Sequence, residues 1–210
     1  MAEEKLLTKR EVVTEFRRRE ILRSAQEVFA REGFQEATMD KIAQNAGVSK
    51  GTIYLYFKNK TDLFFNAISE KLDEFISLIE KSLKGDQSPL RKIWNVVSTQ
   101  MEFFEDHKAF FKVCLNIKGG LYLEHPQEYF ERLKEKYQPY FNEISQVIEK
   151  GCEQGTFCQV EPMKAAYLLA EMINSLILYR IIHETTNPVT QDEKLIYRVF
   201  LRGLLKKGAE

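Results

Sequence analysis

The chain has 210 residues, and its 31 basic and 31 acidic side chains give a formal net charge of zero at pH 7. This balance excludes nucleic-acid binding through overall positive charge, so any such binding requires a local cluster of bases. Hydrophobic residues make up 44% and charged residues 30% of the sequence, which is typical of a globular protein with a buried core.

Two segments bear on localisation. The N-terminal segment, Met1–Glu11, is rich in charged side chains and lacks the apolar run of a signal peptide. The most apolar segment, Ala165–Ile182, is interrupted by Glu171, Asn174 and Arg180, so it lacks the about 18 uninterrupted apolar residues of a membrane helix. We therefore expect a cytoplasmic protein with no membrane partner.

The sequence contains three cysteines, Cys114, Cys152 and Cys158. An odd number without paired short spacings disfavours both a disulfide framework and a zinc ribbon. We expect three small, buried and reduced side chains, and a redox-active thiol remains the alternative.

Helical periodicity extends through nearly the whole chain, so we predict an all-α fold of about nine helices. The first helix begins near Thr14, or near Thr8 if Thr8 and Glu11 form a capping box, and Gly33 ends it. Pro139 should kink the seventh helix. The helices expected after the first cover 39–46, 50–57, about 60–83, 89–106, 109–117, 126–150, 162–183 and 191–206.

The second and third of these helices are short and separated by a tight turn at Gly47, a pattern typical of a helix-turn-helix. Thr38 and Ser49 stand where N-caps of the two helices are expected. Small and branched apolar residues can form a seam between the helices: Ile42, Ala43, Val48, Ile53 and Phe57.

Positive charge is concentrated in the same segment. Between residues 37 and 61, four lysines (41, 50, 58 and 60) face one acid, Asp40, which leaves a local net charge of +3. Helix N-termini at Thr38 and Ser49 favour anions, and Gly51 leaves room for a close approach by DNA. The hydroxyl groups of Tyr54 and Tyr56 can donate to phosphates. On charge alone, an ordinary solvated basic surface is an equal alternative.

Two segments resemble the TetR family of transcriptional regulators: G-F-x-x-A-T-M-D-K-I-A at Gly33–Ala43, and A-G-V-S-K-G-T-I-Y-L-Y-F-K-N-K-T-D-L-F at Ala46–Phe64. They cover roughly the first third of the chain and are highly specific to that family, whereas the remainder matches only in length and helical pattern. The resemblance implies an N-terminal three-helix helix-turn-helix DNA-binding domain at 1–61 and a C-terminal helical ligand-binding and dimerisation domain at 62–210.

The resemblance also implies roles for individual residues. The third helix would enter the major groove, and Ile53 and Phe57 would be core residues. For Leu55 we favour packing over contact with a thymine methyl group. Arg17 and Arg18 could add backbone contacts or form a solvated face. The expected DNA contacts are Lys50, Gly51, Thr52, Tyr54 and Tyr56 on bases or backbone, and Thr38 and Lys60 on phosphates.

A homodimer is expected because two half-sites about one helical turn apart, roughly 34–36 Å, are needed for specificity. The helix at 162–183 is apolar around nearly its whole circumference, so it needs cover on both sides. One side can be its own core and the other a partner chain; burial wholly inside one subunit is the alternative. A second apolar stripe is formed by Leu195, Val199, Phe200 and Leu204.

Aromatic residues are dense between 94 and 141, and some could line a ligand cavity between helices. The resemblance places this cavity among the fifth, seventh and eighth helices. A hydrophobic effector, such as a long-chain acyl compound or a drug, would bind there and shift the helix that begins at Lys60. The expected ligand contacts are Trp94, Met101, Phe104, Tyr137, Phe141 and Met172.

Motifs of common enzyme classes, such as G-x-G-x-x-G, H-E-x-x-H and G-x-S-x-G, are missing from the sequence. The three histidines, His107, His125 and His183, stand far apart without partners at ligand spacing. We therefore expect a ligand-responsive DNA-binding repressor with a double-stranded operator and a small-molecule effector as partners, no enzyme activity, no cofactor and no metal. The alternative is a helical interaction or ligand-binding protein that does not read DNA sequence.

Overall fold

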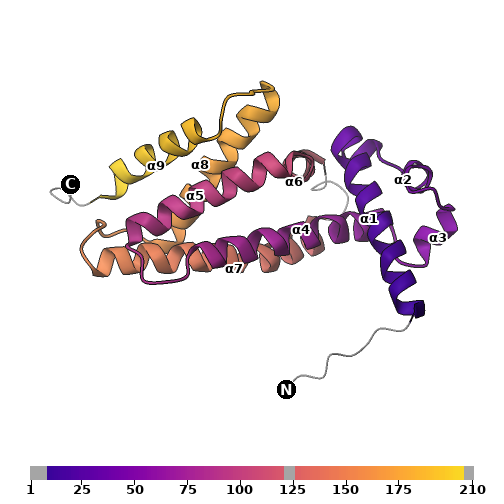
Figure 1. Cartoon of the computed structure of the whole chain (residues 1–210), viewed down its shortest axis with the longest axis horizontal. Helices are drawn as coiled ribbons and strands as arrows, with labels where there is room; N and C mark the ends of the chain where they lie inside the picture. Colours follow the sequence, from indigo (N-terminus) through magenta and orange to yellow (C-terminus); the bar gives the residue numbers. More distant parts are fainter. Residues whose placement is uncertain (1–8, 121–125, 206–210) are drawn as a thin grey trace, which may run out of the picture. The chain divides into compact units, whose positions relative to one another are not determined.

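The computed structural model describes the backbone of residues 9–120 and 126–205, and the side chains of 10–114, 131–132 and 134–205. Nine α-helices account for most of this described part, which confirms the all-α prediction (Figure 1). They are α1 (Lys9–Glu36), α2 (Met39–Asn45), α3 (Lys50–Tyr54), α4 (Lys60–Ser82), α5 (Pro89–Asp106), α6 (Lys108–Gly120), α7 (Pro126–Glu153), α8 (Pro162–Ile182) and α9 (Thr190–Leu204).

The helix ends agree with the sequence where a capping residue or a proline sets them. α5 covers the predicted residues, with Pro89 in its first turn and the Ser88 side chain accepting from the Arg91 amide. α1 begins at the earlier of its two predicted starts, although the predicted cap Thr8 lies outside the described residues. Gly33, at φ 78°, breaks the helical conformation of α1 as expected, and the chain then resumes the helix to Glu36.

Three of the helices after α1 end three residues away from the predicted position, and the others end within two residues of it. α3 ends at Tyr54 instead of residue 57, whereas α6 continues to Gly120 and α7 to Glu153. α7 also continues through Pro139 as one element. Proline lacks one hydrogen-bond donor, but neighbouring turns and tertiary packing can hold the helix together around it.

The chain divides into two compact units. Unit 1 comprises Met1–Lys71 and Lys112–Glu124, and unit 2 comprises Leu72–Phe111 and His125–Glu210, as far as these ranges are described. α4 contributes its first half to unit 1 and its second half to unit 2. α6 is divided in the same way, with 108–111 in unit 2 and 112–120 in unit 1, so two helices belong to both units.

The core of unit 1 forms where α1 meets the first half of α4. The predicted apolar face of α1 is buried, with Ile21, Val28 and Phe29 fully inaccessible. The ring of Phe29 meets that of Phe64 edge to face at a centroid distance of 4.8 Å, and Phe34 meets Phe64 at 5.1 Å. These contacts fix α4 against α1 largely by apolar packing.

In unit 2, α5 packs against α7, α8 and α9, and α7 packs against α8. Among the described helices, α8 alone is long and apolar enough to cross a membrane by length and composition. One face of α8, including Ala166, Leu169 and Ile173, is buried within unit 2, so α8 is a core helix. Its other face exposes Leu168 and Ile182, each 64% accessible, which rules out burial wholly inside one subunit.

The cysteines form no disulfide in the described part of the chain. Cys152 is buried, as expected, but Cys114 and Cys158 are only partly buried, so the expectation of three buried thiols is wrong for these two. The thiol of Cys152, in the last turn of α7, donates to the backbone carbonyl of Cys158 in the turn that follows, at 3.1 Å.

Candidate nucleic-acid interface

The two short helices of unit 1 have the predicted caps. Thr38 is extended (φ −121°, ψ 154°), and its hydroxyl accepts from the Lys41 amide at 3.2 Å. Ser49 is also extended, and its hydroxyl accepts from the Thr52 amide at 3.1 Å. Gly47, at φ 64°, supplies the left-handed residue of the turn between the helices. Local sequence therefore determines where both helices start.

The predicted seam holds α3 against α2. Ile42, Ala43, Ile53 and Phe57 are all buried, whereas Val48 is partly accessible. Because Ile53 points into this seam, the remaining surface of the short helix α3 is turned outward. The core roles expected for Ile53 and Phe57 are confirmed.

The outward surface of α3 carries most of the expected DNA contacts. Lys50, Gly51 and Tyr54 are exposed, and Thr52 and Tyr56 are half-buried. These five residues therefore lie together on one short segment, held in place from behind by the seam.

The packing role that we favoured for Leu55 is wrong. Its side chain is 82% exposed, the highest value among the large apolar side chains in the described part of the chain. Leu55 is the C-cap of α3 with helical backbone angles (φ −70°, ψ −23°). Two residues along a helix are about 200° apart, so the backbone that buries Ile53 directs Leu55 away from the seam.

The lysines of this segment are largely paired with protein groups. The ammonium of Lys50 lies 2.7 Å from Asp40 Oδ2, and this hydrogen bond raises the pKa of Lys50. Lys41 lies 2.8 Å from Glu32 Oε2, and hydrogen bonds from Lys41 and then Arg31 lower the pKa of Glu32. Glu32 precedes the segment in sequence and is shared between Lys41 and Arg31, so the Lys41 ammonium is paired with an acid outside the segment.

Lys60 has a structural role within unit 1. Its ammonium donates to the carbonyls of Phe34 at 2.9 Å and Gln35 at 3.3 Å, and lies 4.4 Å from the centroid of the Phe34 ring. These carbonyls belong to the end of α1, so the first residue of α4 caps that helix. An ammonium has three donors, which leaves one for a phosphate.

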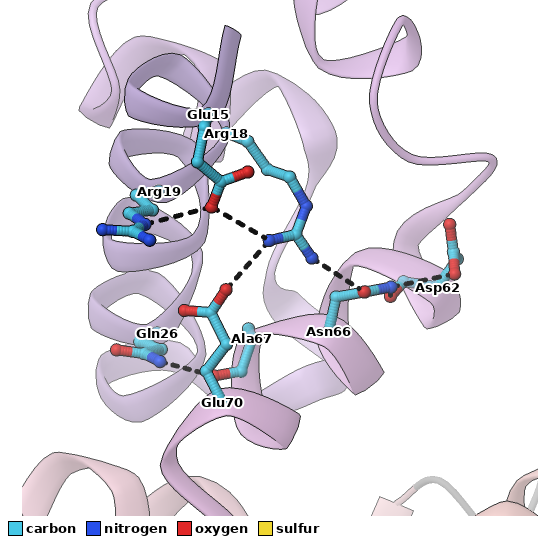
Figure 2. A network of polar contacts seen from close by, with 8 residues as sticks. All are labelled: Glu15, Arg18, Arg19, Gln26, Asp62, Asn66, Ala67 and Glu70. Carbon is cyan, nitrogen blue, oxygen red and sulfur yellow. Dashed lines mark hydrogen bonds and ion pairs between the residues drawn. The ribbon is translucent and has the colours of Figure 1, made fainter. Parts of the chain in front are cut away.

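A polar network joins α1 to the first half of α4 (Figure 2). The guanidinium of Arg18 donates to Glu70 at 2.9 Å and to Asn66 at 3.2 Å, and its Cζ atom lies 5.8 Å from the Phe57 ring centroid. Gln26 donates to the backbone carbonyl of Ala67. Arg18 therefore links α1, α4 and the residue that ends the α3 seam, whereas Arg17 is exposed.

The start of α4 is also joined to the turn that follows α3. The Asp62 carboxylate accepts from the Lys58 amide at 3.0 Å, and the Asp62 amide donates to the Asn59 side chain at 2.8 Å. This reciprocal capping fixes α3 relative to α4. It was not predicted from the sequence, although the N-x-x-D spacing at Asn59–Asp62 is a capping signal.

The expected ligand contacts are only partly gathered in unit 2. Met101 and Phe104 on α5 are buried, and Met172 on α8 is half-buried. Trp94, also on α5, meets Tyr197 of α9 edge to face at 5.2 Å. The two expected contacts from α7 lie together, since the rings of Tyr137 and Phe141 are 6.5 Å apart. Phe141 also stacks on Tyr167 of α8, with ring centroids 3.8 Å apart. Trp94 therefore packs against α9, whereas Phe141 packs against α8.

Sequence reasoning missed a buried polar chain between α5, α7 and α8. The Tyr140 hydroxyl donates to Gln100 Oε1 at 2.7 Å, and Gln100 Nε2 donates to Asn174 Oδ1 at 3.1 Å. Gln100 is 3% and Tyr140 2% exposed, and burial raises the pKa of Tyr140. The signal was present, because Gln100 occupies a core position on the apolar face that includes Val97 and Phe104.

A buried charge in unit 2 was also missed. Arg180 on α8 is buried, and its guanidinium pairs with Asp192 of α9 at 2.7 Å and with Glu105 of α5 at 3.2 Å. Its other contact is the backbone carbonyl of Asn187. In the sequence Arg180 looked like an interruption of an apolar segment, whereas in the fold it joins three helices.

Comparison with known proteins agrees with this architecture. The profile described as bacterial regulatory proteins, tetR family, matches residues 21–67, and the profile described as YsiA-like protein, C-terminal region, matches residues 68–203. The fatty acid metabolism regulator protein of Bacillus subtilis (strain 168) is 30% identical over 137 residues, which cover 65% of this chain and 68% of that protein.

Two solved structures have the same fold. The transcriptional regulator FadR from Bacillus subtilis, crystallised in complex with stearoyl-CoA, matches with a TM-score of 0.77 and 22% identity, over 88% of this chain and 98% of that one. The fatty acid degradation regulator FadR from Bacillus halodurans matches with a TM-score of 0.75 and 23% identity, over 88% and 94% of the two chains. With both profiles matched in order, the chain belongs to the tetR family of bacterial regulatory proteins, helix-turn-helix transcription regulators, and has a YsiA-like C-terminal region.

Proposed function

We propose that this regulator is a repressor that binds a palindromic operator as a homodimer and releases it when a hydrophobic effector binds. The observation that carries the proposal is the outward surface of α3, with Lys50, Gly51 and Tyr54 exposed in front of a buried seam. A short helix of this kind fits the major groove and presents its first residues to base edges. In the proposal Lys50, Gly51, Thr52, Tyr54 and Tyr56 contact bases or backbone, and Thr38 and Lys60 contact phosphates.

A dimer is supported by apolar side chains that unit 2 leaves uncovered. Leu168 and Ile182 on α8 and Val199 on α9 are more than half exposed, and Leu195 is 41% exposed. Exposed apolar patches of this kind mark protein interaction surfaces. Phe200 and Leu204, the other members of the expected α9 stripe, are buried inside the chain, so the proposed contact uses Leu195 and Val199.

For the effector we propose a long-chain acyl-CoA. The relative from Bacillus subtilis is named for fatty acid metabolism, and the FadR structure with the same fold contains stearoyl-CoA. An acyl chain requires an apolar environment, and unit 2 supplies Met101, Phe104 and Phe141 among the helices expected to bind it.

The proposal assigns DNA binding to residues 1–61 and effector binding and dimerisation to 62–210. α4 is the physical link, since it has residues in both compact units. Effector binding would shift α4 and change the spacing of the two α3 helices, and a coupling of about 1–3 kcal/mol would weaken operator binding about 5- to 150-fold. Because the operator and acyl-CoA esters are both inside the cell, we propose a cytoplasmic protein.

The DNA-binding part is tested by selecting operators from random duplex DNA with the purified full chain at near-physiological salt. The variant for comparison is Lys50→Ala, Tyr54→Ala, because both side chains are exposed and their removal should leave folding intact. Lys60→Ala is unsuitable, because the ammonium of Lys60 caps α1. Lys84→Ala, an exposed lysine in the turn before α5, is the matched control.

We expect the wild type and Lys84→Ala to enrich one inverted repeat, and the double variant to lose at least tenfold in affinity for it. If the wild type enriches no sequence, and its weak binding disappears as salt rises, the protein is instead a helical interaction protein that does not read DNA sequence.

The effector is tested on the selected operator with stearoyl-CoA, CoA and stearate as separate additions. Stearoyl-CoA should weaken operator binding about 5- to 150-fold, and CoA alone should not. Met172→Ala, at a half-buried position of α8, should reduce the response to stearoyl-CoA without changing operator affinity in its absence. An unchanged operator affinity in saturating stearoyl-CoA would exclude this effector while leaving DNA binding intact.

A further inference from the structure

The surface of α3 contains an apolar side chain that the polar contacts proposed above do not use. Leu55 is 82% exposed and lies next to the exposed Tyr54. A single exposed leucine is unremarkable on an ordinary surface. Here it lies on the segment that faces DNA, where a polar side chain could bind a phosphate and a leucine cannot.

The neighbouring turn of α3 leaves Leu55 uncovered. Gly51 lies four residues before Leu55, so the two share one face of the helix. The backbone angle φ of Gly51 is outside the left-handed region, and a Cβ atom there would meet only Ser49 Oγ at 3.8 Å. The fold therefore tolerates a side chain at position 51. Because glycine has none, the helix surface next to Leu55 is open to close approach.

The major groove offers one apolar group to such a face. Each A·T pair presents the thymine C5-methyl group there, whereas the other base-edge groups of the groove are hydrogen-bond donors or acceptors. We propose that Leu55 is a specificity-determining residue that contacts a thymine methyl group in each half-site of the operator, with Gly51 allowing the base edge to come close. This inference rests on the proposed function.

The polar neighbours support this occupant over a protein partner. Lys50 and Tyr54 are exposed on the same short helix, so the leucine is bordered by a positive charge and a hydroxyl that suit phosphates. A protein partner that covers one leucine would also have to desolvate the Lys50 ammonium, which already forms an exposed pair with Asp40.

The test replaces the thymines of the selected operator one at a time with deoxyuridine, which pairs in the same way but lacks the C5-methyl group. For the wild type we expect a loss of about fourfold in affinity at one symmetric thymine in each half-site, equivalent to burial of one methyl group at about 0.8 kcal/mol. For Leu55→Ala we expect weaker binding to the thymine operator and no further loss at that position.

Two controls isolate the contact. Tyr54→Phe keeps Leu55 and should keep the deoxyuridine effect. The melting temperature of Leu55→Ala should equal that of the wild type, because the side chain is exposed in the free protein.

Three outcomes would overturn the proposal. The first is a wild type that is insensitive to deoxyuridine at every thymine. The second is the same sensitivity in Leu55→Ala, and the third is a change in oligomeric state of Leu55→Ala without DNA, which would assign the leucine to a protein contact. If no operator is enriched at all, both the repressor proposal and the methyl contact are wrong. This result differs from the three above, in which the repressor proposal still stands.

Discussion

Two glycines, one in each unit, stand in very different surroundings. Gly51 lies in α3 and Gly151 in the last turn of α7, and neither has a left-handed backbone. A Cβ atom at Gly51 would meet only Ser49 Oγ at 3.8 Å, which is ordinary van der Waals contact. A Cβ atom at Gly151 would lie 2.1 Å from Cδ2 of Phe157. Phe157 is 1% exposed, and its amide donates to the Gly151 carbonyl, so the ring has little room to move.

The fold accounts for one of these glycines and leaves the other unexplained. At Gly151 a side chain is excluded, because the ring of Phe157 in the same unit occupies the space where its Cβ atom would lie. At Gly51 the free protein would accept alanine, and alanine would favour the helix. The fold gives no reason for glycine at position 51, and this agrees with the close DNA contact proposed for α3.

The largest effect on stability is expected for Gly151→Ala. The added methyl group would collide with the buried Phe157 ring and force the turn after α7 to shift, at a cost of about 2 kcal/mol in the free energy of unfolding. Urea or thermal unfolding followed by circular dichroism measures this change.

Gly203→Ala is the matched control for that measurement, since it is a helical glycine with no atom near the new Cβ. It should be neutral or stabilise by up to about 1 kcal/mol. Equal unfolding midpoints for Gly151→Ala and the wild type would mean that the Phe157 ring can relax, and the contrast between the two glycines would disappear.

The second effect is on DNA affinity. Gly51→Ala should leave the unfolding free energy unchanged or raise it by about 0.5–1 kcal/mol. The same methyl group would hold the base edges away from α3, so we expect operator affinity to fall about tenfold, or about 1.4 kcal/mol. Fluorescence anisotropy on the selected operator measures the loss. Wild-type affinity in Gly51→Ala would show that the glycine is not needed for close approach.

Local rules in the sequence predicted much of unit 1. The caps and the turn of the helix-turn-helix were predictable, because each depends on residues at most four positions apart in sequence. The residues concerned are Thr38, Gly47 and Ser49. Contacts between distant residues were not. The capping of α1 by Lys60 joins residues 25 and 26 apart in sequence. Leu55 was misjudged because its neighbour Ile53 is core and α3 is too short for a periodic pattern.

In unit 2 the helices were predictable but their mutual contacts were not. Pro89 and Pro162 correctly predicted the starts of α5 and α8. The chain from Tyr140 through Gln100 to Asn174 depends on which faces of three helices meet. Periodicity predicts that each helix has an apolar face, but it does not determine the partner of that face.

A third prediction compares one N-cap from each unit, Ser49 of α3 and Glu161 of α8. Ser49→Ala removes the acceptor of the Thr52 amide and the hydroxyl contact with Thr52 Oγ1 at 2.8 Å. We expect a loss of about 1 kcal/mol in unfolding free energy. Glu161, the N-cap of α8, makes no capping hydrogen bond, so Glu161→Ala is the control and should change little. Similar losses in the two variants would contradict the assignment of Ser49 as the effective cap.

The smallest effects are expected at two ion pairs on α4, which has residues in both units. Glu70 pairs with Arg18 at 2.9 Å in unit 1, and Asp73 pairs with Lys136 in unit 2 (Figure 2 shows the first pair). The carboxylates are 48% and 59% exposed, so Glu70→Gln and Asp73→Asn should each change the unfolding free energy by less than about 0.5 kcal/mol.

Operator affinity should nevertheless separate these two variants. The guanidinium that Glu70 holds lies over the ring of Phe57, which closes the seam behind α3. A looser Arg18 should therefore lower operator affinity about twofold in Glu70→Gln, whereas Asp73→Asn should bind as the wild type does. Anisotropy titrations of both variants without effector measure the difference. Equal affinities would mean that the other contacts between α1 and α4, such as the Phe29–Phe64 ring pair, are sufficient and that the Arg18–Glu70 pair does not influence α3.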